Sequence, residues 1–113
     1  MKLAGAVGLF ICNALWRLSR LPSAGRSLVR ALGSEDEDLR TIAGMFLVQA
    51  GKSAEPLLEE ALRRRKNLPM VLSVLASIGD RKFEPELREF SLDRDPKVAQ
   101  AARDALRVLT AHQ

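Results

Sequence analysis

The sequence is poor in aromatic residues and has too few cysteines for a disulfide. Aromatic residues make up 4% of the 113 positions, and tyrosine is absent. A core with so few rings must be built from Leu, Ala, Val and Ile, and this composition favours helices over sheets. The single cysteine, Cys12, cannot form a disulfide within the chain, so a secreted disulfide-stabilised scaffold is excluded.

Motifs of catalysis and metal binding are also missing. The single histidine, His112, has no acid or nucleophile at a predictable spacing, and a general base requires positioned neighbours. Cys12 lies in an apolar run, where a free cysteine behaves as a small hydrophobic residue. The acidic run 35–38 lacks the alternation and the glycine of a calcium loop, and we interpret it as a helix start. We therefore expect no catalytic residue, no metal and no cofactor, and a protein that is not an enzyme.

Acidic residues are absent from the first third of the chain. Residues 1–33 contain five basic and no acidic side chains, whereas residues 34–113 contain 13 basic and 14 acidic ones. The net charge of +4 therefore belongs to the N-terminal third and implies no broad basic surface. For this reason we do not expect nucleic acid as a partner.

Strand patterns are nearly absent, and helical spacing of apolar residues occurs along the whole chain. Longer helices are predicted within 38–51, 67–79 and 95–109, and shorter ones within 24–32, 54–62 and 84–90. Equivalent positions recur at nearly constant offsets along the chain, as Leu47 and Leu75 or Leu28 and Leu58 do. A period of about 30 residues built from two helices is typical of a stacked α-solenoid.

The segments "SEDEDLR", "DRDPKV" and "AQAARDAL", with helix ends at "QAG" and "SIGD", resemble the HEAT-repeat family. The resemblance is to the short repeats of phycobilisome-lyase-like proteins and covers residues 34–109 better than residues 1–32. It implies an all-α fold: an α-solenoid of about three HEAT-like helix pairs plus a C-terminal capping helix. Arg40 and Arg103 lie near the positions of the family's polar ladder, and the shorter helices are expected to line the concave side.

The apolar run from Leu3 to Trp16 is predicted to be the longer helix of a first pair, with Pro22 before its shorter partner. We thus divide the chain into an apolar first helix pair, residues 1–33, and HEAT-like repeats, residues 34–113. The outer side of a terminal solenoid helix should be polar, but apolar residues surround this one. A membrane or a partner must therefore cover it, and the residues expected to make that contact are Leu3, Val7, Leu9, Phe10, Ile11 and Trp16.

Several interpretations of this apolar run remain open. From Leu3 to Trp16 a helix rises about 21 Å, short of the ~30 Å hydrocarbon core, so lodging in the interface is easier than spanning. If the run did span, the arginines that follow it would lie on the cytoplasmic side. Lys2 and the apolar stretch also fit a secretory signal, although arginines rather than a small-residue cleavage site follow it. The acid-free first third also loosely fits a mitochondrial presequence.

A second set of predicted contacts is basic. The run "RRRK" ends a predicted helix, where cations also complement the helix dipole. Together with the arginines of the first third, it is expected to contact an acidic partner or lipid headgroups. The members of this set are Arg17, Arg20, Arg26, Arg30, Arg63, Arg64, Arg65 and Lys66.

The function expected from these observations is a non-catalytic interaction or scaffold module. We expect it to be an accessory subunit of a membrane-associated complex, held at the cytoplasmic face by its first helix and bound to other protein subunits. The first alternative is a soluble homo-oligomeric adaptor in which two first helices pair. The second is a HEAT-like lyase, for which the sequence offers no candidate residue.

Overall fold

The computed structural model describes residues 3–19 and 22–111, with the side chains of residues 5–17 and 24–111. Within these ranges the chain is helical and contains no strand, as the composition predicts. Arg20 and His112 lie outside the described residues, as does the side chain of Leu3. The seven α-helices of the described ranges are α1 (Leu3–Ser19), α2 (Pro22–Ala31), α3 (Glu37–Ala50), α4 (Glu55–Arg63), α5 (Leu68–Ile78), α6 (Glu84–Phe90) and α7 (Pro96–Ala111).

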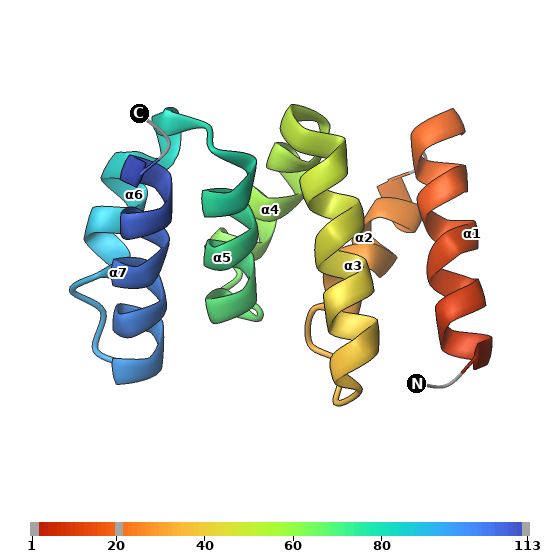
Figure 1. The fold of residues 1–113 in the computed structure, drawn as a ribbon, viewed down its shortest axis with the longest axis horizontal. Coiled ribbons are helices and arrows are strands. Elements are labelled where there is room, and N and C mark those ends of the chain that lie inside the picture. The colour runs from red at the N-terminus through yellow and green to blue at the C-terminus, as the bar shows by residue number, and fades with distance from the viewer. Residues whose placement is uncertain (1–2, 20–21, 112–113) are drawn as a thin grey trace.

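The helices form two layers. Figure 1 shows α1, α3, α5 and α7 side by side in one row, with the shorter helices α2, α4 and α6 behind them. The row runs along the longest dimension of the molecule, which measures 37 × 26 × 25 Å. As a result α1 and α7 lie at opposite ends of the row, each with one neighbour within it.

The helix ends follow local sequence signals. The Asp36 carboxylate accepts hydrogen bonds from the backbone N–H groups of Asp38 at 2.9 Å and Leu39 at 3.4 Å, and thereby caps α3. Gly51 and Gly79 end α3 and α5 with φ of 59° and 83°, a region that a side chain disfavours. The predicted stops at both glycines are confirmed.

One hydrophobic core runs through the molecule from α1 to α7. Its largest fully buried side chains are Leu28, Leu32, Leu47, Leu58, Val71, Leu72, Leu75, Phe83, Leu87 and Leu109. Burial of each contributes about 1.5–3 kcal/mol relative to an exposed position. Leucine dominates this set, as the scarcity of aromatics predicts, and Phe83 is its aromatic member.

Two short 3-10 turns were not predicted from the sequence. η1 (Gly51–Ala54) precedes α4, and η2 (Arg81–Phe83) precedes α6. The Asp80 carboxylate accepts a hydrogen bond from the backbone N–H of Lys82 at 3.1 Å and starts η2. This turn places Phe83 in the core immediately before α6 begins.

Candidate functional site

The first candidate surface is one side of α1. Val7, Phe10, Ile11 and Leu15 are 48%, 58%, 55% and 46% exposed, although all four are large apolar side chains. Their spacing of three and four positions places them on the same side of the helix. We call these four residues the apolar face of α1. Beside them the backbone of Gly8 borders open space, with no atom within 4 Å of where a Cβ would lie.

Two residues expected on this surface lie elsewhere. Leu9 and Trp16 are only 7% and 5% exposed and belong to the core, so the structure corrects the expectation for both. The helical period is the physical reason. At about 100° per residue, Leu9 and Trp16 point away from Val7 toward the rest of the chain. The sequence could not orient a helix that is apolar on every side.

The apolar face of α1 continues toward the neighbouring helix of the row. The rings of Phe10 on α1 and Phe46 on α3 lie edge to face, with centroids 5.1 Å apart. Phe46 is half-buried and contacts one side of the Phe10 ring, while the rest of the Phe10 side chain stays exposed. Across residues 3–19 and 22–111, no helix has the length and apolar composition needed to cross a membrane.

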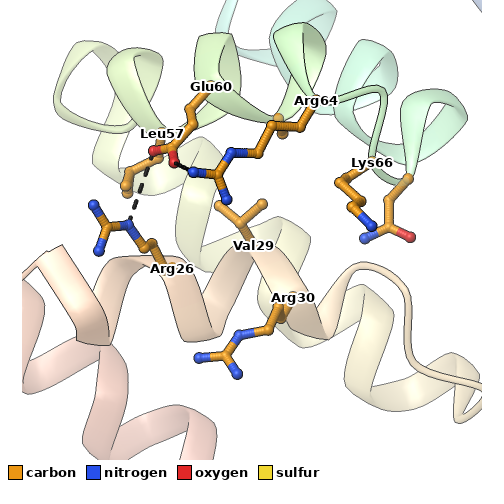
Figure 2. Close-up of a pocket in the computed structure, with 9 residues that line it drawn as sticks. Arg26, Val29, Arg30, Leu57, Glu60, Arg64 and Lys66 are labelled. Carbon is orange, nitrogen blue, oxygen red and sulfur yellow. Dashed lines mark ion pairs between the residues drawn. The ribbon is translucent and has the colours of Figure 1, made fainter.

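The second candidate surface is a basic pocket between α2 and α4, which we define by Arg26, Arg30, Arg64 and Lys66. These four of the eight predicted basic residues line a cavity of about 300 Å³, and Glu60 is the acidic residue that lines it with them. Figure 2 shows the charged groups of Arg26, Arg64 and Lys66 on the α4 side of α2, around Val29, whereas the guanidinium of Arg30 points away from α4. The apolar part of the lining comes from Val29, Leu57 and Ala61.

Glu60 orders two of the guanidinium groups. Its Oε1 lies 3.1 Å from Nη2 of Arg64, one turn further along α4, and its Oε2 lies 3.9 Å from Nε of Arg26 on α2. Arg30 donates a hydrogen bond to the Ser27 hydroxyl at 3.4 Å, within its own helix. Glu60 thus lies between one guanidinium from α2, that of Arg26, and one from the C-terminal end of α4, that of Arg64.

In the loop from α4 to α5, the neighbouring cations Arg65 and Lys66 point in different directions. Arg65 and Asn67 both have positive φ, 53° and 51°, an uncommon conformation for residues with a side chain. The guanidinium of Arg65 turns away from the pocket and donates to both carboxylate oxygens of Asp93 at 3.0 Å. Lys66 and Asn67 instead line the pocket.

The loop from α4 to α5 comes close to the end of α2 at one point. The side chain of Asn67 lies against the backbone of Gly33, where an added Cβ would be 2.5 Å from its Oδ1. A side chain at position 33 would therefore require the Asn67 side chain to move. Of the other predicted cations, Arg63 is exposed on α4 and Arg17 on the last turn of α1, and neither lines the pocket.

One charged contact that the sequence analysis missed lies behind α4. Glu55 is 3% exposed, and its Oε1 lies 2.8 Å from Nζ of Lys82. This hydrogen bond to Glu55 raises the pKa of Lys82. The two residues belong to successive helix pairs, so no local spacing could reveal the contact. In the part of the chain that the structure describes, no cluster of three or more His, Cys, Asp or Glu side chains could hold a metal ion.

Comparisons with family models, with curated proteins and with solved structures found no match to this chain. Function must therefore be argued from the two surfaces described above. One is apolar and lies at an end of the helix row, and the other is basic and lies between two helices of the second layer.

Proposed function

We propose that this protein is a non-catalytic, HEAT-like α-solenoid that acts as an interaction module of a membrane-associated complex. In this proposal the apolar face of α1 lies in the surface of an anionic membrane at its cytoplasmic side, and the remaining helices are available to other subunits. The observation that carries the proposal is the exposure of Val7, Phe10, Ile11 and Leu15 at one end of the helix row.

The solenoid part of the proposal is supported by the alternation of longer and shorter helices in two layers (Figure 1). It is also supported by two arginines that reach back from their helices to preceding backbone. Arg40 donates to the backbone carbonyl of Ser34 at 2.6 Å, and Arg103 donates to that of Ser91 at 3.2 Å. Each arginine thus ties its helix to the turn that precedes it.

The choice of a membrane as occupant follows from the charges around α1. The N-terminal third of the chain contains no acidic side chain, and Arg17 is exposed at the end of the helix that carries the apolar face. Such a helix combines apolar burial with attraction to anionic headgroups when it lies in the interface. Interfacial lodging does not require the length of a spanning helix.

The proposal is tested by flotation of the full-length protein with vesicles of phosphatidylcholine and phosphatidylglycerol. Val7→Asp replaces an apolar side chain that is 48% exposed in the free protein with a charge that would have to enter the membrane interface, so we expect vesicle binding to fall about tenfold or more. Val108→Asp is the matched control, because Val108 is 42% exposed on α7 at the opposite end of the row. It should leave binding unchanged.

Two results would overturn this assignment. Full-length protein that stays unbound in the presence of vesicles contradicts membrane docking directly. A molar mass that rises with concentration in light scattering, and that Val7→Asp returns to the monomer value, would favour the homo-oligomeric adaptor instead.

A further inference from the structure

We infer that the basic pocket between α2 and α4 is a binding site for a small phosphate monoester that carries an apolar group. Four cationic side chains and one carboxylate line this pocket; because the Arg30 guanidinium turns toward Ser27, the charges that face the cavity sum to +2. This inference does not depend on membrane docking, because α1 contributes no residue to the pocket lining.

The type of cation favours phosphate. Three of the four cations are arginines, whose planar guanidinium groups can donate two parallel hydrogen bonds to one oxyanion. A phosphate monoester carries a charge of about −1.5 to −2 near neutral pH, which matches the excess positive charge better than a single carboxylate does. A carboxylate would leave half of that excess uncompensated.

The pocket is organised before any ligand arrives. Glu60 holds the Arg64 guanidinium at 3.1 Å and lies 3.9 Å from that of Arg26, so these two groups come from different helices to one side of the cavity. Lys66 approaches from the loop in which Arg65 and Asn67 have positive φ. Because this backbone conformation is already set, binding requires little reordering of the chain.

The floor of the pocket predicts what the phosphate is attached to. Val29 and Leu57 are half-buried, Ala61 is buried, and none of the three offers a polar group from its side chain. A volume of about 300 Å³ lies at the lower end of the range for small-molecule sites. The expected ligand is therefore a phosphate next to a compact apolar group, such as an aryl or short alkyl ester.

The test is a calorimetric titration of the full-length protein with phenyl phosphate at constant ionic strength. Inorganic phosphate tests the apolar floor, and phenyl sulfate, which has the same ring but one negative charge, tests the charge match. We expect phenyl phosphate to bind more tightly than either. Equal binding of phenyl phosphate and phenyl sulfate would overturn the assignment to a dianion.

Paired arginine variants test the site itself. Arg64→Gln should weaken phenyl phosphate binding about tenfold, the effect of losing one charge-assisted hydrogen bond. Arg63→Gln makes the same charge change at an exposed position of α4 outside the pocket, and should change binding less than twofold. Equal losses in the two variants would mean nonspecific attraction and would overturn the inference.

A third arm separates a soluble ligand from a lipid headgroup of the same chemistry. If Arg64→Gln weakens binding to phosphatidic acid vesicles but not to phosphatidylglycerol vesicles, the phosphate belongs to a lipid. If Arg64→Gln leaves binding to both kinds of vesicle unchanged, the ligand is a soluble monoester. Val7→Asp should retain full phenyl phosphate binding. Failure of membrane docking and failure of this inference are thereby distinguished.

Discussion

The two ends of the helix row differ in the side chains that their terminal helices expose. On α7 most of the exposed side chains are polar, among them Gln100, Arg103, Asp104 and Arg107, and Val108 is the exposed large apolar one. On α1 the equivalent outward side is the apolar face. A terminal helix has no neighbour on its outer side and normally carries a polar surface for that reason. The two ends of the row therefore differ in their exposed side chains, which are mostly polar on α7 and large and apolar on one side of α1.

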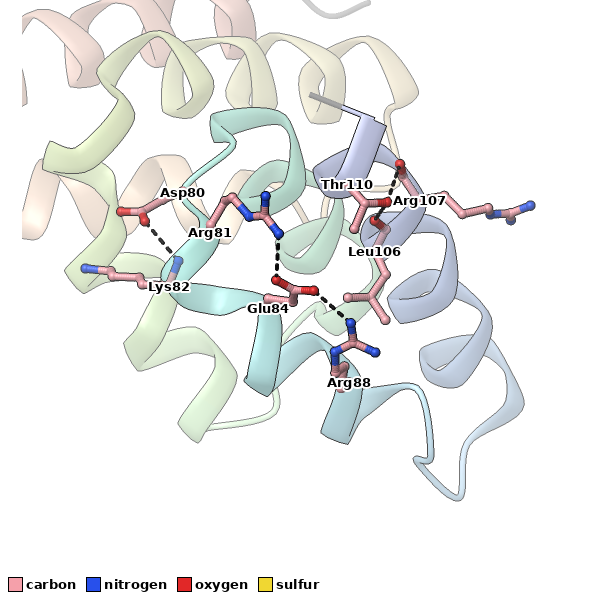
Figure 3. A network of polar contacts seen from close by, with 8 residues as sticks. All are labelled: Asp80, Arg81, Lys82, Glu84, Arg88, Leu106, Arg107 and Thr110. Atoms are coloured by element: carbon pink, nitrogen blue, oxygen red, sulfur yellow. Dashed lines mark hydrogen bonds and ion pairs between the residues drawn. The ribbon is translucent and has the colours of Figure 1, made fainter. Parts of the chain in front are cut away.

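The two ends also differ in their ion pairs. Figure 3 shows the Glu84 carboxylate between two guanidinium groups, with Arg88 at 2.8 Å and Arg81 at 3.2 Å. The hydrogen bond from Arg88, and after it the one from Arg81, is the main reason that the pKa of Glu84 lies below its ordinary value. On α7, Arg107 also pairs with Asp104. No such network can form within α1 and α2, because the N-terminal third of the chain contains no acid.

The largest predicted effect compares two phenylalanines from the two halves. Phe83 is 1% exposed and Phe10 is 58% exposed. Phe83→Ala should lower the free energy of unfolding by about 3–5 kcal/mol, because it leaves a cavity in the core. Phe10→Ala should lower it by less than about 1 kcal/mol, because most of that ring already faces solvent. Urea denaturation followed by circular dichroism measures both, and similar losses would show that Phe10 is part of the folding core.

An intermediate effect is predicted for two glycines at the N-terminal end. A Cβ at position 25 would lie 2.6 Å from Cδ1 of Leu57 and 3.0 Å from Nε1 of Trp16, whereas position 8 is open. Gly8→Ala should stabilise α1 by about 0.5–1 kcal/mol through helix propensity. Gly25→Ala should destabilise the protein by about 1 kcal/mol or more, because Leu57 or Trp16 must shift.

Thermal unfolding of the two glycine variants measures this difference. A stabilising Gly25→Ala would show that α1, α2 and α4 do not pack as closely as described. A destabilising Gly8→Ala would show that the side of α1 carrying Gly8 is covered in the free protein, and would weaken the contrast between the two ends.

The smallest effect is a pH dependence confined to the C-terminal half. The backbone N–H of Lys82 holds the pKa of Asp80 low, and the backbone N–H of Asp95, together with Arg65, does the same for Asp93. A carboxyl with a lowered pKa stabilises the fold above its unfolded pKa, and this contribution is lost as pH falls through the folded value. Burial raises the pKa of Glu86, which opposes the trend at one position.

Hydrogen exchange compared at pH 6 and near pH 3 measures this pH effect. Amides of α6 and α7 should lose more protection in acid than those of α2, because Asp80, Glu84 and Asp93 all lie in the C-terminal half. Equal losses along the chain would mean that the ion pairs of Figure 3 contribute no local stability.

Features that depend on residues close together in the chain could be predicted, whereas features that depend on distant residues could not. The cap of α3 at Asp36 and the stops at Gly51 and Gly79 depend on backbone groups nearby in the chain, and all three were predictable. The orientation of α1 was not, since a helix with apolar residues on all sides carries no signal for its inner side. Leu9 and Trp16 face inward because they pack against the core formed by the rest of the chain.

The basic pocket is a second feature that depends on residues far apart in the chain, and its lining could not be predicted from local sequence. The sequence identified the cations one by one, but Arg26 and Arg64 line the same pocket only because α2 and α4 lie next to each other, with Gly25 close to Leu57 of α4. Arg65 shares the basic run with Arg64 and Lys66 but turns toward Asp93 instead. The sequence thus showed which residues are cationic, whereas the fold decided which of them line the same cavity.

By itself the sequence determined that this chain is helical, where most of its helices end, and that its first helix has no acidic residue near it in the chain, because each of these is a property of composition or local spacing. Only the tertiary structure decided which apolar side chains of α1 face outward and which cations share a pocket. Those outcomes depend on how helices distant in sequence pack, since burial and charge proximity are set by neighbours in space.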